Sequence, residues 1–281
     1  MMRKVELAEH AGFCFGVKRA VDESVKTQKQ YNKKIYTLGP LIHNNDMVKF
    51  LEKNNIFAIN LEDVEKLEAG EVIVIRSHGV RESTIKYLED KGMIVVNATC
   101  PFVTNIQIKA NKHSKDGYKI IIIGDENHPE VQGVNGWCDD SALITMNGEF
   151  DFKIPNKVCV VCQTTQKKEI WTKTINKISE NAKEILAFNT ICSATEVRQK
   201  SADDISKKVD VMIVVGGKES SNTIKLYEIC KKNCERSYHI ENVNELDMNW
   251  LYKDDLVVGV TAGASTPDWI IKEVIKKIQI N

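Results

Sequence analysis

Continuous apolar runs alternate with stretches of helical period along this chain. Five runs rich in valine and isoleucine have the length of strands: EVIVIR at 71–76, KIIIIG at 119–124, KVCVVC at 157–162, VMIVVG at 211–216 and LVVGVT at 256–261. Amphipathic stretches such as ESTIKYLEDKG and TIKLYEICKKN lie between them. Strands that are apolar throughout are buried on both faces, which is typical of parallel sheets covered by helices. The pattern therefore predicts an α/β fold.

Each apolar run ends in a polar loop. These loops read SHG at 77–79, DENHPE at 125–130, QTTQ at 163–166, KESSN at 218–222 and TAGAST at 261–266. In open parallel sheets, ligands bind outside the carboxyl ends of the strands. We therefore expect the binding site to be built from these loops.

Three cysteines recur in one context, at near-equal spacing of about 90 residues. They are Cys14 in GFCFGVKRA, Cys100 in NATCPFVTN and Cys192 in NTICSATEV. Each follows an extended stretch and opens a helical pattern; Pro101 suits a first helical position, and Ser193 with Glu196 matches a capping box. The spacing predicts three similar small α/β units, each with a cysteine at a helix N-terminus.

This position favours metal binding by the three cysteines. A helix N-terminus carries partial positive charge and unpaired amide donors, which stabilise the thiolate, the form of cysteine that binds metal. Three converging thiolates would suit an iron–sulfur cluster, or zinc with a fourth ligand from elsewhere. The spacing leaves both readings open.

The other five cysteines are interpreted as structural. Cys159 and Cys162 form a CxxC pair inside a strand run, where residues three apart point to opposite faces, and no second CxxC completes a zinc site. Cys230 and Cys234 lie one helical turn apart without a visible partner cluster, and Cys138 is similarly unsupported. Small buried hydrophobic residues are the expected role.

Hydroxyl, amide and imidazole groups in the strand-end loops indicate an anion site. No Walker loop or dinucleotide fingerprint is present, so ATP and NAD are not indicated. Lysine and arginine are nearly absent from these loops, which suits a small, enclosed diphosphate. Glu130 is the carboxylate placed for proton transfer. The candidate anion-binding residues are His43, His78, His128, Ser220, Ser221, Asn222 and Ser265.

Composition narrows the partners of this chain. Its 281 residues are 42% hydrophobic and 28% charged, and 39 lysines and arginines balance 39 aspartates and glutamates. No global field attracts nucleic acid or an anionic membrane, so neither is expected as a partner. The N-terminus has charges where a signal peptide has its apolar core, and the longest apolar runs are far too short to span a bilayer. We expect a cytoplasmic protein.

Taken together, the motifs resemble the 4-hydroxy-3-methylbut-2-enyl diphosphate reductase family of the methylerythritol phosphate pathway. The resemblance covers essentially the whole chain and rests on GFCFGVKRA, GPLIHN, RSHGV, NATCPFVT, NHPEVQG, QTT, CSATEVRQ, ESSNT and TAGASTPDW, in this order. It implies three α/β units arranged pseudo-threefold around a central iron–sulfur cluster. The expected units are 14–97, 98–191 and 192–281, with 1–13 packing against the third.

The resemblance also implies a role for each candidate residue. Cys14, Cys100 and Cys192 would hold one 4Fe–4S cluster with one open iron. The seven histidine, serine and asparagine residues named above would bind the diphosphate. Glu130 would deliver a proton, helped by Thr164 and His128.

The implied reaction is reductive dehydroxylation of (E)-4-hydroxy-3-methylbut-2-enyl diphosphate to isopentenyl and dimethylallyl diphosphate. Two electrons would come from a reduced donor such as ferredoxin or flavodoxin. Two alternatives remain open: an iron–sulfur hydro-lyase that removes water without net electrons, and a non-enzymatic iron–sulfur sensor.

Overall fold

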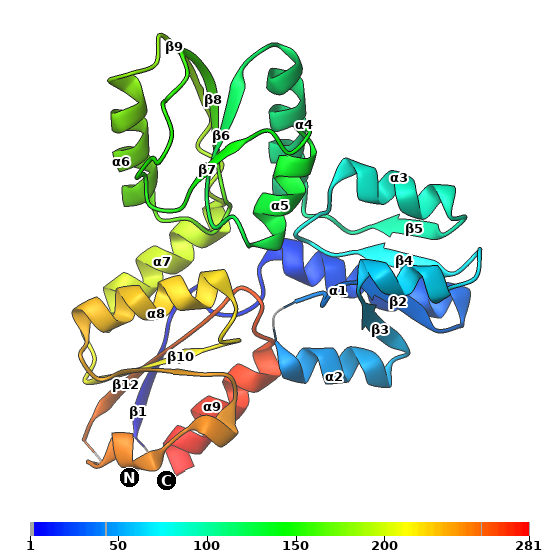
Figure 1. The fold of residues 1–281 in the computed structure, drawn as a ribbon. Helices are drawn as coiled ribbons and strands as arrows, with labels where there is room; N and C mark the ends of the chain where they lie inside the picture. The colour runs from blue at the N-terminus through cyan, green and yellow to red at the C-terminus, as the bar shows by residue number, and fades with distance from the viewer. Residues whose placement is uncertain (1–2, 43, 254, 281) are drawn as a thin grey trace. The chain divides into compact units, whose positions relative to one another are not determined.

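Three four-stranded sheets are present in the computed structural model, which describes residues 3–42, 44–253 and 255–280 (Figure 1). Every strand pair in the described residues is parallel. The expected α/β class with three parallel-sheet units is confirmed. No helix in these ranges is long and apolar enough to cross a membrane.

The first sheet has the strand order β3-β2-β4-β5. Its strands are β2 (Ile35–Leu38), β3 (Ile56–Ile59), β4 (Val72–Ile75) and β5 (Ile94–Asn97). The connecting elements are α2 (Asn45–Lys53), η1 (Leu61–Lys66) and α3 (Glu82–Asp90).

The second sheet repeats this arrangement in the order β7-β6-β8-β9. Its strands are β6 (Lys119–Ile123), β7 (Leu143–Thr145), β8 (Lys157–Cys162) and β9 (Glu184–Ala187). Helix α4 (Pro101–Lys115) leads into the sheet, and α5 (Pro129–Gly136) and α6 (Lys168–Ser179) connect its strands.

The third sheet has the order β1-β12-β10-β11 and joins the two ends of the chain. Its strands are β1 (Lys4–Leu7), β10 (Val211–Val215), β11 (Ser237–Ile240) and β12 (Val257–Ala262). The remaining elements are α1 (Phe15–Tyr31), α7 (Ser193–Ser206), α8 (Ser221–Asn233), η2 (Val243–Glu245), η3 (Met248–Leu251) and α9 (Asp268–Ile280).

Side chains alternate between two buried faces along the central strands. On β10, Ile213 packs with Ile270 and Val274 of α9, whereas Val214 packs with Leu226 and Cys230 of α8. Each such aliphatic side chain contributes roughly 1.5–3 kcal/mol when fully buried. The continuous apolar runs in the sequence reflect this burial on both sides.

The chain forms two compact units. Unit 1 comprises Met1–Lys18, Ile42–Lys49 and Ser193–Asn281, and contains the third sheet. Unit 2 comprises Arg19–Leu41 and Phe50–Cys192, and contains the first and second sheets. The boundaries expected at 97/98 and 191/192 stay a prediction.

Candidate active site

The site residues follow equivalent strands in all three sheets. In the first and second sheets the chain runs outward in opposite directions from the two central strands, which makes the gap between them a topological switch point. In the third sheet, helices α8 and α9, which follow the central strands β10 and β12, pack on opposite faces. His78 follows β4 and Thr164 follows β8, while Ser220 and Ser265 follow β10 and β12. His128 follows β6. His43, which follows β2 in sequence, lies outside the described residues.

The three candidate cysteines follow the same edge strand of each sheet. Cys14 comes after β1, Cys100 after β5 and Cys192 after β9, and each immediately precedes a helix. The amide of Val17 donates to Cys14 Sγ at 3.4 Å, as a helix-capping contact would. Cys100 is the N-cap of α4, with Pro101 in the first turn. These positions put each sulfur beside unpaired amide donors.

Exposure separates these three cysteines from the rest. Cys14, Cys100 and Cys192 are half-buried, whereas the other five are buried. Burial raises the pKa of Cys138 to about 11 and the pKa of both Cys159 and Cys230 to about 12, so these thiols stay protonated. Cys159 and Cys162 pack into cores on opposite faces of β8, as the strand position indicated.

The chemistry of the donor set fits an iron–sulfur cluster, because three half-exposed thiols occupy equivalent helix N-termini. Within the part of the chain that the structure describes, no three His, Cys, Asp or Glu side chains are grouped closely enough to hold a metal ion. Cys14 belongs to unit 1, and Cys100 and Cys192 belong to unit 2. Convergence of the three cysteines stays a prediction.

Glu130 and Thr164 form a buried pair in unit 2. The Thr164 hydroxyl donates to Glu130 Oε2 and its amide donates to Oε1, both at 2.6 Å. Glu130 is 3% exposed and Thr164 is 8% exposed. Thr164 follows β8, and Glu130 lies in the first turn of α5, the helix after β6, so the segments that follow the two central strands bring the pair together. The pair can move a proton from a carboxyl group through a hydroxyl.

His128 is held in one tautomer by its own helix. It is the N-cap of α5, and its Nδ1 accepts the amide hydrogen of Glu130 at 3.2 Å. Because Nδ1 accepts, the neutral ring carries its hydrogen on Nε2, which can donate to an anion. The His78 ring lies edge-on to His128, with ring centroids 5.4 Å apart.

Backbone contacts join both cysteine loops of unit 2 to these groups. The Cys100 amide donates to the Ser77 carbonyl, next to His78, at 3.0 Å, and the Cys192 amide donates to the Thr164 carbonyl at 3.0 Å. A single chain of direct contacts therefore runs from Cys100 through the histidines, Glu130 and Thr164 to Cys192.

Unit 1 brings Cys14 together with hydroxyl and amide groups. The Cys14 amide donates to the Ala264 carbonyl at 3.1 Å, and the neighbouring Ser265 hydroxyl donates to Ser220 Oγ at 3.3 Å. Ser220 is the N-cap of α8, whose first turn contains Ser221 and Asn222.

The Asn222 side chain is buried at the N-terminus of α8 without a hydrogen-bond partner in the described residues. It is 3% exposed, and both its oxygen and its nitrogen lack a partner within those residues. Buried polar groups are almost always hydrogen-bonded, and an unpaired one costs about 1–3 kcal/mol. An orphaned amide at a helix N-terminus is the expected mark of an anion-binding position.

Two glycines permit the close packing of these loops. At Gly79, with φ of +71°, an added Cβ would lie 2.5 Å from Gln107 Nε2 on α4, the helix that begins after Cys100. At Gly263, an added Cβ would lie 2.0 Å from Thr223 Oγ1 on α8. A side chain at Gly79 would be strained by the positive φ and would displace the end of Gln107, and one at Gly263 would collide with Thr223.

Sequence reasoning missed two arginines that hold the cysteine loops. Arg19, on the helix after Cys14, donates to the Thr99 carbonyl at 3.0 Å, directly before Cys100. Arg198, on the helix after Cys192, donates to the Gly12 carbonyl at 2.7 Å, two residues before Cys14. The only signal in the sequence was an arginine in the second turn after each of these two cysteines.

The family model of LytB protein matches residues 5–279. A protein named 4-hydroxy-3-methylbut-2-enyl diphosphate reductase from Clostridium perfringens strain 13 is 66% identical over 281 residues, covering 99% of both chains. A solved structure of (E)-4-hydroxy-3-methyl-but-2-enyl diphosphate reductase is 39% identical, with a TM-score of 0.73 and 99% of both chains covered.

A second solved structure, the E-1-hydroxy-2-methyl-but-2-enyl-4-diphosphate reductase from Plasmodium falciparum, has a TM-score of 0.89 at 28% identity. The match covers 99% of this chain and 88% of the Plasmodium chain. An iron–sulfur cofactor is consistent with the family. Matched over nearly its whole length in both sequence and fold, this chain belongs to the LytB protein family.

Proposed function

We propose that this chain catalyses reductive dehydroxylation of (E)-4-hydroxy-3-methylbut-2-enyl diphosphate to isopentenyl and dimethylallyl diphosphate. As a LytB family member it is an oxidoreductase of isoprenoid biosynthesis. The observation that carries the proposal is the whole-length match to proteins named as this reductase, on a chain with an orphaned Asn222 amide and a buried Glu130–Thr164 pair.

Cys14, Cys100 and Cys192 hold one 4Fe–4S cluster with one iron left without a protein ligand. Their half-burial and their helix N-termini support this assignment over the five buried cysteines. When bound, the cluster would pass on two electrons from the reduced donor and would offer a Lewis-acidic iron. Arg19 and Arg198 keep the loops before Cys100 and at Cys14 in place.

The diphosphate is bound by neutral donors. Ser220, Ser221, Asn222 and Ser265 of unit 1 offer hydroxyl and amide hydrogens at the N-terminus of α8, where the helix dipole favours an anion. His128 offers Nε2–H, since its Nδ1 is already occupied. His78 and His43 complete the set.

Glu130 supplies the proton that turns the leaving hydroxide into water. Thr164 hydrogen-bonds to both carboxylate oxygens and lies between Glu130 and the substrate alcohol in the proposed complex. The two electrons stay with the allyl fragment after the C–O bond breaks. A second proton then adds at either end of that fragment, which yields the two products.

The electron donor is a reduced carrier such as ferredoxin or flavodoxin, and the reaction takes place in the cytoplasm. Neither nucleic acid nor a membrane takes part in this proposal. The balanced charge of the chain, 39 cationic against 39 acidic residues, supports the first of these two exclusions.

The test uses anaerobically reconstituted protein, pre-reduced viologen and the hydroxymethylbutenyl diphosphate. We expect viologen oxidation that depends on substrate, with isopentenyl and dimethylallyl diphosphates as products. Water release without viologen oxidation would support an iron–sulfur hydro-lyase instead. Protein that holds iron and sulfide but leaves the diphosphate unchanged would support a sensor.

A further inference from the structure

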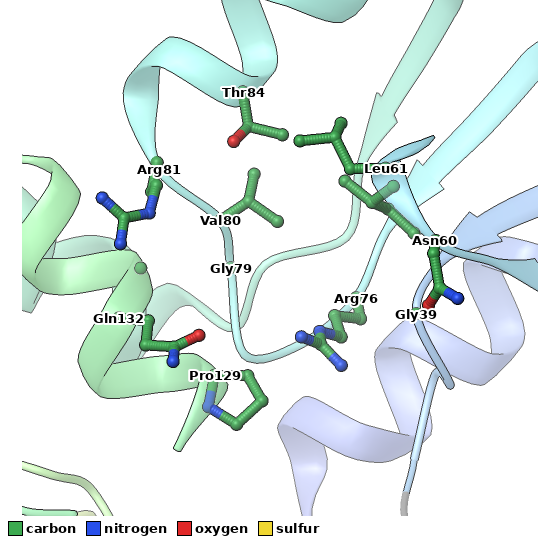
Figure 2. Close-up of a pocket in the computed structure, with 12 residues that line it drawn as sticks. Gly39, Asn60, Leu61, Arg76, Gly79, Val80, Arg81, Thr84, Pro129 and Gln132 are labelled. Atoms are coloured by element: carbon green, nitrogen blue, oxygen red, sulfur yellow. The ribbon is translucent and has the colours of Figure 1, made fainter. Parts of the chain in front are cut away.

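A cavity of about 240 Å³ lies in unit 2, and its lining includes Gly79 and Pro129, the residues that directly follow His78 and His128 in the sequence (Figure 2). Its lining includes Gly39 of the GPLIHN motif, Arg76 of RSHGV and Gln132 of NHPEVQG. Arg81 and Thr84, at the start of α3, close another side. Its size suits a small ligand, since pockets for drug-sized molecules are usually larger.

The lining carries positive charge that the protein does not fully neutralise. No Asp or Glu is among the described residues that line the cavity. Arg81 forms an ion pair with Asp140. The Arg76 guanidinium has no hydrogen bond or ion pair in the described ranges, and its Nε is buried without a partner. Burial lowers the pKa of Arg76, as expected for a cation without a counter-ion.

The second sheet provides an internal comparison. Gln163 follows β8 as Arg76 follows β4, and each packs against the glycine after the preceding central strand, Gly124 or Gly39. The Gln163 Oε1 accepts the amide hydrogen of Asp125 at 3.1 Å, so this side chain is satisfied within the fold. Arg76 has no such internal bond, although a Cβ at Gly39 would lie only 2.7 Å from its Nη1.

We propose that Arg76 binds a phosphate group, free or carried by a small metabolite, at a second anion site in this cavity. A guanidinium recognises phosphate through two parallel hydrogen bonds, and the Gln132 amide and Thr84 hydroxyl offer further donors in the lining. An anion would compensate a half-buried charge that no acidic residue among the described lining residues neutralises. The lining shares no residue with the set proposed to bind the substrate.

The test titrates the iron–sulfur-loaded protein, labelled with ¹⁵N-arginine, with inorganic phosphate, and observes the side-chain Nε–H resonances. Ionic strength is held constant with chloride. We expect one resonance, absent from the Arg76→Gln variant, to move in a saturable way. In the Arg76→Gln variant, phosphate binding followed through the Arg81 Nε–H resonance should be at least tenfold weaker. Inorganic diphosphate and a phosphate monoester, titrated in the same way, distinguish a free from a carried phosphate group.

Two variants serve as controls. Arg236→Gln removes a guanidinium that donates to the Trp250 carbonyl, and should leave phosphate binding unchanged. Asn222→Ala alters the proposed substrate site and should leave the Arg76 shift intact. An Arg76 resonance that does not move, or one that moves equally with chloride, would overturn the proposal. A chain that fails to reduce the diphosphate would defeat the proposed function without affecting this titration.

Discussion

Unit 1 offers hydroxyl and amide groups at its strand ends, whereas unit 2 offers imidazoles and a buried carboxylate. Both use the same parallel-sheet topology, with site residues after the two central strands and a cysteine after one edge strand. The difference lies in which groups titrate. Serine and asparagine side chains do not act as acids or bases in the ordinary pH range, whereas the imidazole and carboxyl groups can take up and release a proton. In the proposed function, the hydroxyl and amide groups of unit 1 bind the diphosphate, whereas unit 2 supplies the proton-transferring Glu130 as well as the binding residues His78 and His128.

The largest expected effect concerns the candidate cluster cysteines, which both units contain. Replacing Cys14, Cys100 or Cys192 with Ser should remove bound iron and sulfide and lower activity more than about a hundredfold. Substituting a residue that only hydrogen-bonds to a metal ligand usually has a smaller effect than this. Iron and sulfide analysis provides the measurement. Cys159→Ala is the control, because this thiol lies in a core. Full cluster content in any one of the three Ser variants would contradict that cysteine's assignment.

Glu130→Gln should break proton transfer in unit 2 while leaving binding intact. We expect kcat to fall about 10²–10⁴-fold with KM changed only a few-fold, because a positioned general acid typically contributes this much. Steady-state kinetics with reduced viologen would measure both constants. A rise in KM at constant kcat would instead move Glu130 to the binding role.

Asn222→Ala should produce the opposite division in unit 1. Loss of a hydrogen bond to a charged group costs about 1.5–3 kcal/mol, so we expect KM to rise about 10- to 150-fold with kcat nearly unchanged. Asn233→Ala, at the other end of α8, removes contacts to Asp203 and Ser206 and should leave KM alone. Equal effects of the two substitutions on KM would count against a ligand at Asn222.

Two substitutions test how each unit holds its cysteine loop: Arg198→Gln for the loop before Cys14 in unit 1, and Arg19→Gln for the loop before Cys100 in unit 2. Each substitution removes a charged donor from a backbone carbonyl, and we expect a loss of about 1–3 kcal/mol in the free energy of unfolding. Iron release to a chelator should be faster in both variants than in Arg236→Gln. If the rate of iron release is unchanged while the free energy of unfolding is lower, both arginines stabilise the fold in general and do not act on the cluster site.

The smallest expected effect is a pH dependence within unit 1. Burial lowers the pKa of His239, whose Nε2 lies 2.9 Å from the Gly216 carbonyl ahead of the Ser220 loop. Lys218 also lowers this pKa, while Glu241 and Glu245 oppose it. Below the unfolded pKa of about 6.5, the unfolded chain binds a proton that the folded chain does not, so stability should fall as pH falls. His239→Gln should flatten this slope in denaturant titrations at pH 5.5 and 7.5.

Local patterns were sufficient for much of the site. The apolar runs indicated buried parallel strands, and the loops after them contain every described candidate for anion binding and proton transfer. The sequence also predicted that Cys159 and Cys162 lie in one strand and point to opposite faces of the sheet. Their places in two different hydrophobic cores confirm this prediction. The assignments to Cys14, Cys100 and Cys192 as ligands remain predictions, because they depend on how separate parts of the chain meet.

The sequence by itself determined the class of fold and the kind of chemistry at each strand end. Both depend on local properties, namely the spacing of hydrophobic residues along the chain and the type of residue at each position. Only the tertiary structure decided that β1 pairs with β12 and that Thr164 donates to both oxygens of Glu130. It also decided that Arg198 reaches the Gly12 carbonyl, 186 residues away in the chain. Such contacts depend on strand order and register, which non-local packing sets and no local pattern encodes.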